Sequence, residues 1–338
     1  MKIVVDGFGG DHAPNEVVAG CVLATEKFED LEIVLVGNQD VLNNLLKENG
    51  YNGNRIEVLH SETIITNDDV PTHAIRQKKD SSLVVAFDYI NEHPEVDGFV
   101  SAGSTGAVLT GALLKLGRLE GIKRPALAPP IPNKNGGYTL LIDCGANMDS
   151  KPEFLAQFAL MGSIYMKKMY GIENPRVALL NVGVEDKKGN DLAHQAFAIL
   201  KDMKNINFVG NMEARDLTSG EYDVVVSDGF AGNVALKSTE GAVVFVTKMI
   251  KEEIKKGSLF QKIGALLMKG VFNKIKTRMD YNAVGGSPFL GCKKVVVKSH
   301  GSSDRVAILG SITLVRKLAL AGFVEELDDE LKTLNLGE

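Results

Sequence analysis

Short runs of β-branched and other apolar residues alternate with amphipathic segments of helical length along almost the whole chain. This alternation is typical of units in which helices join parallel strands and cover both faces of a sheet. The pattern therefore predicts an α/β protein with a doubly wound, largely parallel sheet. The expected strands are residues 2–6, 32–37, 55–59, 97–101, 138–143, 176–181, 206–209, 223–227 and 293–298. The expected helices are residues 14–27, 81–92, 104–117, 152–170, 191–203, 233–256 and 304–321.

Composition limits the environment and the partners that we expect. The length of 338 residues suggests about two lobes with a sizeable core, and the net charge of −5 does not favour nucleic-acid binding. The three cysteines lie far apart and form no C-x-x-C pair, which indicates a reducing compartment. The sequence predicts no secretory signal and no apolar run near the roughly 20 residues that span a bilayer. We expect a cytoplasmic protein whose contact with membranes is peripheral.

The first glycine-rich stretch is "VVDGFGGDHAP" at residues 4–14. A dinucleotide loop requires G-x-G-x-x-G at the start of a helix. Gly7 and Gly9 match the first two positions, but His12 occupies the third, where a side chain would block the close approach of helix and strand. The spacing therefore disfavours a dinucleotide site and leaves an anion-binding loop or a tight turn open.

Glycines gather in six stretches that each follow an expected strand. In an open α/β sheet this edge binds ligands, and helix N-termini there favour phosphate or carboxylate. A turn with a helix cap explains any one stretch by itself, whereas six on one edge predict a cleft for an anionic substrate. The stretches are residues 6–12, 101–106, 143–149, 181–191, 227–233 and 299–304. Four of their aspartates are expected to orient donors or bind a metal, namely Asp6, Asp11, Asp143 and Asp228.

Several kinds of catalysis lack their motifs in this sequence. It has no G-x-S-x-G elbow, no H-E-x-x-H pair and no phosphate-binding G-x-x-x-x-G-K-[ST] loop. Cys144 is the best placed thiol, but a buried structural cysteine is the simpler interpretation. The remaining chemistry is one in which the nucleophile arrives as a substrate, such as phosphate attacking an activated acyl group.

Taken together, the loops resemble those of the bacterial phosphate acyltransferases of phospholipid synthesis, which transfer a fatty acyl chain from acyl carrier protein to inorganic phosphate. Two positions differ: Gly7-Phe8 stands where the family usually has Ala-Met, and Ser104 where it usually has Asn. The matching stretches reach to about residue 322. They are "GGDHAP" (9–14), "SAGSTGA" (101–107), "GAN" with a following Asp149, "NVGVEDKKGN" (181–190), "GNMEARD" (210–216), "VVVSDGFAGNVALK" (224–237), "GGSPFLG" (285–291) and "HGSSD" (300–304).

The resemblance implies a fold of two α/β lobes around a cleft. This α/β/α sandwich is similar to that of phosphotransacetylases and of isocitrate and isopropylmalate dehydrogenases, and it is usually dimeric. We expect one lobe to comprise residues 1–150 and 299–338, and the other to comprise residues 151–298.

The resemblance also implies roles for individual residues. Lys188, chosen over Lys187 by the family's K-G-N pattern, would bind phosphate, and Asn233 would serve phosphate or the oxyanion unless it only caps a helix. Asp228 would fix Lys188 or a loop amide, or cap the next helix. No metal and no organic cofactor is required. The other expected phosphate- or substrate-binding residues are Gly9, Gly10, Asp11, His12, Gly103, Ser104, Thr105, Gly106, Asp143, Asn147, Gly229, His300, Ser302 and Ser303.

Residues 254–279 form a basic amphipathic segment with seven lysines and arginines and no acid. Gly264 and Gly270 suggest a break into two short helices. A dimer arm or a core helix with a solvated lysine face would explain the segment, as would a membrane-surface helix or a dock for acidic acyl carrier protein. In the family it is a membrane-contacting tip near the dimer axis, which suits delivery of product to a membrane-bound glycerol-3-phosphate acyltransferase. The expected contacts with an anionic membrane or the carrier are Leu259, Phe260, Lys262, Ile263, Leu267, Lys269 and Val271.

Three other functions remain open. A short-chain phosphate acetyl- or butyryltransferase that uses acyl-coenzyme A would share the fold and the chemistry, but it would not need the basic segment. An NAD-dependent decarboxylating dehydrogenase of the same fold is disfavoured by the glycine spacing. The sequence is also compatible with a non-catalytic sensor on this fold.

Overall fold

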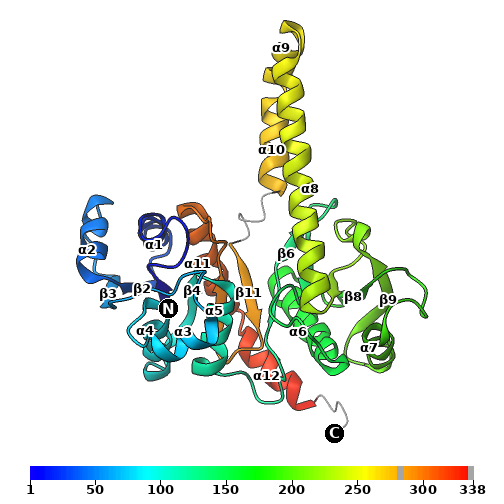
Figure 1. Cartoon of the computed structure of the whole chain (residues 1–338), viewed down its shortest axis with the longest axis horizontal. Coiled ribbons are helices and arrows are strands. Elements are labelled where there is room, and N and C mark those ends of the chain that lie inside the picture. Colours follow the sequence, from blue (N-terminus) through cyan, green and yellow to red (C-terminus); the bar gives the residue numbers. More distant parts are fainter. Residues whose placement is uncertain (280–284, 334–338) are drawn as a thin grey trace.

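The computed structural model describes residues 1–279 and 285–333, which form two β-sheets flanked by helices and a projecting helical arm (Figure 1). The sheets have the strand orders β3-β2-β1-β4-β12-β11-β5 and β6-β7-β10-β8-β9, which confirms the predicted α/β class. The strands are β1 Lys2–Asp6, β2 Glu32–Gly37, β3 Ile56–His60, β4 Val96–Ser101, β5 Ala126–Leu127, β6 Pro130–Pro132, β7 Tyr138–Ile142, β8 Arg176–Asn181, β9 Asn207–Glu213, β10 Val224–Val226, β11 Ser287–Leu290 and β12 Val295–Lys298.

Most neighbouring strands pair in parallel, as the alternating pattern predicts. The parallel pairs join β1 to β2 and β4, β2 to β3, β4 to β12, and β10 to β7 and β8, with β8 also joined to β9. The strands that the sequence analysis missed are β5, β6 and β11, which pair antiparallel with their neighbours. They are too short to show a periodic pattern, and two of them contain proline.

Most of the helices were predicted correctly. The missed helices are α2, α3 and α12, and the long helix α8 begins at Gly229 rather than at residue 233. The helices are α1 Asn15–Lys27, α2 Gln39–Glu48, α3 Pro71–Gln77, α4 Ser82–Glu92, α5 Thr105–Gly111, α6 Pro152–Tyr170, α7 Asp191–Asp202, α8 Gly229–Lys256, α9 Leu259–Leu267, α10 Lys269–Met279, α11 Arg305–Leu320 and α12 Phe323–Thr333, with short π and 3₁₀ turns at Ala112–Leu116 and Ala214–Asp216.

The sheets do not follow the predicted division at residues 150 and 298. Strands β6 and β7 belong to the five-stranded sheet, whereas β11 and β12 belong to the seven-stranded sheet. The chain therefore crosses between the sheets after β5 and returns before β11. Residues 280–284 and 334–338 of the predicted lobes lie outside the described residues. The lobe boundaries themselves stay a prediction.

One apolar core joins the two sheets. Side chains from β1, β7 and β10 belong to the same buried cluster as those from α6, α11 and α12. Within it the ring of Tyr165 on α6 packs edge-on against Phe323 of α12, with 6.1 Å between the ring centres. Burial of this shared apolar surface holds the sheets together on the side of α6.

The arm consists of the distal part of α8 together with α9 and α10, which fold back beside it (Figure 1). Ser258 caps α9 through a reciprocal capping box with Gln261. The two short helices predicted within 254–279 are confirmed, but their junction is at Met268, while Gly264 and Gly270 lie inside α9 and α10. Among the described residues no single helix is long and apolar enough to cross a membrane, although the bent pair Arg305–Leu320 and Phe323–Lys332 passes by length and composition.

Candidate active site

Three of the glycine-rich loops meet at the carboxyl edge of the seven-stranded sheet. They follow the neighbouring strands β1, β4 and β12, so their backbones are brought together. The amide of Asp11 donates to the carbonyl of Gly301 over 2.7 Å, and the amide of Ser299 donates to Ser101 over 2.9 Å. The other three glycine-rich stretches follow β7, β8 and β10 of the five-stranded sheet, so the prediction of six stretches on one sheet edge is wrong, although the loops after β1, β4 and β12 do meet.

A buried carboxylate, Asp6, orders this group of loops. It accepts the hydroxyl of Ser101 over 2.7 Å and the amide of Phe8 over 3.2 Å, and the same hydroxyl accepts the amide of Gly103 over 3.0 Å. A Cβ atom at Gly9 would lie 2.5 Å from the Asp6 carboxylate, so only glycine fits there. Burial raises the pKa of Asp6, while its hydrogen bonds act in the opposite direction.

A second group of loops is organised by Asp143 at the edge of the five-stranded sheet. Its carboxylate accepts the amides of Leu127, Cys144 and Asn147 over 2.9, 2.7 and 2.6 Å. The side-chain amide of Asn147 donates to Asp143 over 3.0 Å and to the carbonyl of Pro125 over 2.8 Å. Asp143 and Asn147 therefore hold the loop in place, and their predicted role in substrate binding stays a prediction. Burial raises the pKa of Asp143.

Helix α8 begins against this loop. The Asp228 carboxylate caps it by accepting the amides of Phe230 and Ala231, each over 2.9 Å, so the structure shows the helix-cap alternative. The amide of Gly229 donates to the carbonyl of Asn147 over 2.8 Å. A Cβ atom at Gly232 would lie 2.0 Å from the carbonyl of Asp143, which explains why glycine occupies that position.

A cleft of about 390 Å³ lies between the two groups of loops. One wall comes from loops of the seven-stranded sheet and the other from the loop after β7 and from α8. The polar side chains that line the cleft are donors with a single carboxylate among them. They are Thr105, Asn233, Lys237, Glu240, Ser287, Lys298, Ser299 and His300.

Lys298 is a buried cation in the floor of this cleft. Its side chain lies at the end of β12, and the residue is 7% exposed. The ammonium donates to the carbonyl of Ala102 over 3.2 Å and to that of Ser299. Burial lowers the pKa of Lys298 to about 8, because the nearby carboxylates of Asp6 and Asp11 compensate only partly for lost hydration. At neutral pH the cleft therefore contains a positive charge.

Two further groups shape the charge of the cleft. The ammonium of Lys237 lies 2.8 Å from the Glu240 carboxylate, one turn further along α8. Burial, together with the positive charge of Lys237, lowers the pKa of His300, and Nδ1 of His300 lies 2.8 Å from the hydroxyl of Ser302. Neutral and cationic donors therefore face the same space, as an anionic substrate requires.

Of the predicted site residues, Thr105, Asn233 and His300 line the cleft, and Gly301, which was not predicted, lines it beside His300. Ser303 is buried, and its hydroxyl has no hydrogen-bond partner among the described residues. The other predicted residues that follow β1, β4 and β12 do not line the cleft. They are Gly9, Gly10, Asp11, His12, Gly103, Ser104, Gly106 and Ser302.

The structure does not bring Lys188 to this cleft. It lies exposed on the loop after β8, where its carbonyl accepts the side-chain amide of Asn181 over 2.9 Å. Strand β10 separates β7 from β8, so the loop after β8 is not next to the loop after β7, and no residue of 181–191 lines the cleft. The role predicted for Lys188 stays a prediction.

Sequence reasoning missed the two lysines of the cleft. Lys298 ends the apolar run "KVVVKS", and Lys237 follows Asn233 by one helical turn. A charged residue at the end of an otherwise apolar strand is the signal that would have revealed Lys298.

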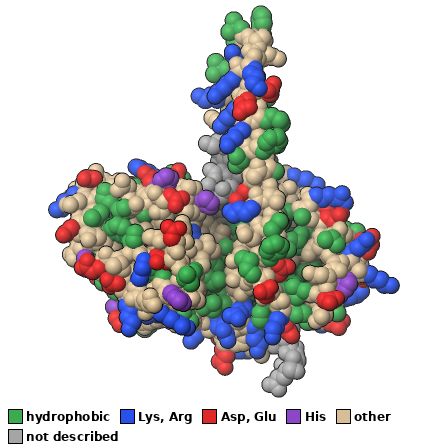
Figure 2. All heavy atoms as spheres, viewed as in Figure 1, with side chains coloured by type: hydrophobic (Ala, Val, Ile, Leu, Met, Phe, Trp, Pro, Cys, Tyr) green, Lys and Arg blue, Asp and Glu red, His purple; other side chains and the backbone are tan. Residues whose placement is uncertain are grey.

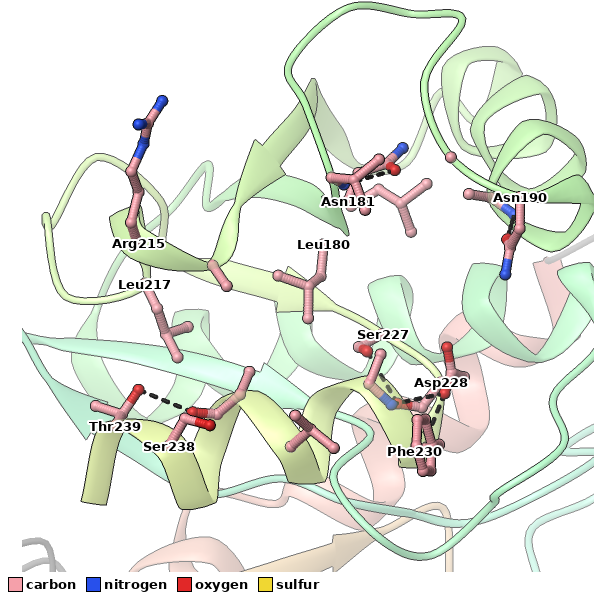
Figure 3. Close-up of a pocket in the computed structure, with 18 of the residues that line it drawn as sticks. Leu180, Asn181, Asn190, Arg215, Leu217, Ser227, Asp228, Phe230, Ser238 and Thr239 are labelled. Atoms are coloured by element: carbon pink, nitrogen blue, oxygen red, sulfur yellow. Dashed lines mark hydrogen bonds between the residues drawn. The ribbon is translucent and has the colours of Figure 1, made fainter. Parts of the chain in front are cut away.

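A second and larger cavity of about 920 Å³, open to solvent, lies on the other side of α8 and is bordered by β8, the loop after it, the turn after β9, and α7 (Figure 3). Its wall is mostly apolar, and Leu180 and Leu217 point towards α8 (Figure 3). Asn181, Gly189 and Asn190 of the loop that carries Lys188 also line it.

The described residues offer little for other chemistries. No group of three or more His, Cys, Asp or Glu side chains among them is placed to hold a metal ion. Cys144 is buried, and burial raises its pKa well above the ordinary value, which disfavours the thiolate. The interpretation of Cys144 as a structural thiol agrees with this environment.

Comparison with known proteins gives consistent similarities. The profile of a family described as "Fatty acid synthesis protein" matches residues 1–326. Proteins named phosphate acyltransferase are similar over nearly their whole length: one from Bacillus licheniformis is 47% identical over 329 residues, covering 96% of this chain and 98% of the relative. Another, from Clostridium perfringens strain SM101, is 44% identical over 331 residues, covering 98% and 97%.

Solved structures resemble this one in fold. A phosphotransacetylase from Streptococcus pyogenes superposes with a TM-score of 0.60 at 17% identity, covering 96% of this chain and 94% of the other. A branched-chain phosphotransacylase from Enterococcus faecalis gives a TM-score of 0.57 at 14% identity, covering 94% and 99%. The predicted phosphotransacetylase-like fold is therefore confirmed.

Proposed function

The chain belongs to the family of bacterial phosphate acyltransferases, and from this premise we propose that it transfers a long-chain acyl group from acyl carrier protein to inorganic phosphate for phospholipid synthesis. The observation that carries the proposal is the cleft between the sheets, where a buried lysine and several neutral donors face one space. That arrangement suits a reaction whose nucleophile is itself an anion.

In the proposed reaction, hydrogen phosphate occupies the cleft and one of its oxygens attacks the thioester carbonyl. A carbon–oxygen bond forms, the carbon–sulfur bond breaks, and the proton of hydrogen phosphate passes to the departing sulfur. Lys298 and Lys237 offset the negative charge, and Asn233 donates to the oxyanion. The products are acyl phosphate and the free thiol of the carrier.

The direct test is phosphate-dependent turnover. The purified protein is mixed with a chelator and with acyl carrier protein that carries a 16-carbon acyl chain. Free carrier protein should be released only when phosphate is added. Release without phosphate would indicate a thioesterase and overturn the proposal. Faster transfer from acetyl- or butyryl-coenzyme A than from the long-chain carrier would instead support the short-chain alternative, and reduction of NAD would support the dehydrogenase.

We also propose that the tip of the arm binds an anionic membrane surface, which makes the protein peripherally membrane-associated in the cytoplasm. Apolar side chains are exposed at the tip: Leu259 is 71%, Phe260 86% and Leu267 83% exposed. Figure 2 shows apolar groups at the tip of the arm, and lysines and arginines along the arm between the tip and the sheets. Apolar burial at roughly 25 cal/mol per Å² and up to about 1 kcal/mol per lysine near the surface together support reversible binding.

A charge placed at the tip tests the membrane proposal. Leu267→Glu should abolish co-sedimentation with anionic vesicles while leaving soluble turnover and Tm unchanged. Leu320→Glu is the matched control, because Leu320 is also exposed but lies on α11. A Leu267→Glu variant that still binds vesicles, or that melts earlier, would contradict the proposal and favour a dimer contact or a carrier dock. A homodimer and delivery of product to a membrane-bound glycerol-3-phosphate acyltransferase belong to the same proposal.

A further inference from the structure

The apolar cavity beside α8 has no role in the phosphate chemistry described above. It measures about 920 Å³, which lies within the range of roughly 300–1,000 Å³ usual for small-molecule sites. We propose that it holds the hydrocarbon chain of the acyl donor. The identity of the donor rests on the proposed function, whereas binding of an alkyl chain is measured without it.

Several polar groups on the cavity wall are bonded within the protein. The side-chain oxygen of Asn190 accepts the amide of Ala193 over 2.9 Å, and the hydroxyl of Thr239 donates to Ala235 over 2.8 Å. The hydroxyl of Ser227 donates to the carbonyl of Asp228 over 2.9 Å. A ligand therefore meets few unmet hydrogen-bonding groups here, which favours an apolar occupant over a polar one.

Two charged residues line the cavity, and both have partners within the protein. The Asp228 carboxylate accepts the amides of Phe230 and Ala231 at the start of α8. The guanidinium of Arg215 pairs with Glu213, and it points away from α8 (Figure 3). The rest of the lining is mostly leucines, alanines and valines, with the exposed Phe230 at its edge. The cavity thus offers burial to a hydrocarbon without requiring a charge on it.

The position of the cavity connects it to the cleft through α8. At about 3.6 residues per turn, Asn233 and Lys237 face the cleft while Ala235 and Ala242 face the opposite way, into the cavity. Phe230 and Val234 lie on the helix surface between these two faces, and they are 65% and 50% exposed. When the carbonyl of an acyl group is at Asn233, its hydrocarbon chain can therefore pass over this apolar surface of α8 into the cavity.

The diameter of α8 determines how long an acyl chain must be to reach the cavity from the cleft. A helix with its side chains is about 10–12 Å across. An acyl chain of four carbons would stay in the cleft, whereas a chain of sixteen carbons would pass the edge and fill the cavity. Each buried methylene should strengthen binding about fourfold. The cavity thereby accounts for a preference for long chains by the same enzyme.

Binding is measured first with a fluorescent reporter. The chain contains no tryptophan, so a single substitution introduces the only indole. Ala242→Trp places it on the cavity wall, and Ala198→Trp places it on an exposed position of α7 that does not line the cavity. Palmitate brominated at mid-chain should quench Ala242→Trp saturably and leave Ala198→Trp unquenched. Equal quenching in both, or none in either, would overturn the proposal.

Chain-length selectivity is measured second. Phe230→Ala should lower kcat/KM for a 16-carbon donor about tenfold and for a 4-carbon donor by less than twofold. Phe245→Ala is the matched control, because Phe245 is on the same helix and is also 65% exposed but lies outside the cavity. An equal loss with both donors would contradict the inference. If the wild type transfers nothing to phosphate, the proposed function fails, and quenching still decides the cavity.

Discussion

The cleft and the apolar cavity lie on opposite faces of α8 and differ in where their walls come from. The cleft of about 390 Å³ takes loops from both sheets, and its cations lie on β12 and α8. The cavity of about 920 Å³ is bordered only by the five-stranded sheet, the turn after β9 and the helices that pack on this sheet. The charged groups thus lie where the two sheets meet. The apolar cavity lies between the five-stranded sheet and the helices that pack on it. Helix α8 therefore separates a charged site, which suits phosphate, from an apolar site, which suits a hydrocarbon chain.

The largest expected effect comes from the cations and donors of the cleft. Lys298→Met and Asn233→Ala should each lower kcat/KM by roughly 10²–10³, because transition-state charge loses its stabilisation. The loss in kcat/KM should be equal for short-chain and long-chain acyl donors. Phe230→Ala, in contrast, should affect mainly the long-chain acyl donor. The readout is initial rate against phosphate concentration.

The control for Lys298→Met is Lys294→Met. Lys294 also donates to two backbone carbonyls, those of Pro94 and Val96, each over 2.7 Å, but it lies outside the cleft. It should change kcat/KM less than twofold. A similar loss in the two variants would show that Lys298 acts only through its backbone contacts. Lys188→Ala, measured beside them, tests the family-based prediction of a loss as large as that of Asn233→Ala.

The next largest effect concerns the wall itself. Gly232→Ala would place a methyl group against the carbonyl of Asp143, so the start of α8 must shift. We expect a loss of about 2–3 kcal/mol in the free energy of unfolding, together with weaker phosphate binding. Denaturant unfolding measures the first and steady-state kinetics the second.

Gly241→Ala supplies the comparison on the same helix. A Cβ atom at Gly241 meets nothing within 4 Å, so alanine should stabilise the helix by about 0.5–1 kcal/mol. If Gly232→Ala were as stable as Gly241→Ala, the close contact between α8 and the Asp143 loop would not hold in solution.

A smaller effect should appear with pH. The pKa of Lys298 is about 8 in the folded protein and 10.5 ordinarily, so between these values the unfolded state binds more protons. The free energy of unfolding should therefore rise with pH from about 8 towards 10.5, while activity falls as the ammonium is lost. Lys298→Met should remove this rise in stability, and its persistence in that variant would assign the titration to another group.

The smallest effect is expected at the ion pair beside the cleft. Arg305 donates to the Glu16 carboxylate over 2.7 and 2.9 Å, and this lowers the pKa of Glu16 to about 2. The pair's contribution is present above pH 4.5 and is lost as pH falls towards 2. Arg305→Ala should lower Tm near neutral pH by less than Gly232→Ala does, since exposed pairs contribute little. A larger drop would mean that this pair, not the backbone contacts, anchors the loops.

Sequence reasoning succeeded where structure is local. Strand–helix alternation and the glycine-rich strand ends are encoded within a few residues, so the parallel pairs and the meeting of the loops were predictable. The placement of Lys298 was not, because it depends on β12 lying beside β4, with Ala102 as a partner 196 residues away. The placement of Lys188 depends on β10 lying between β7 and β8. Such long-range strand order leaves no periodic signal in one sequence.

Because α8 is one unbroken helix, the length of the arm also determines the direction in which its tip faces. It contains 28 residues, begins at the wall between the two cavities and ends at the base of the tip. One inserted residue in the shaft would move the tip by only about 1.5 Å but rotate it by about 100° relative to the cleft. Seven inserted residues, close to two full turns, would restore its direction. Arms of different length are therefore interchangeable only when they differ by nearly whole turns.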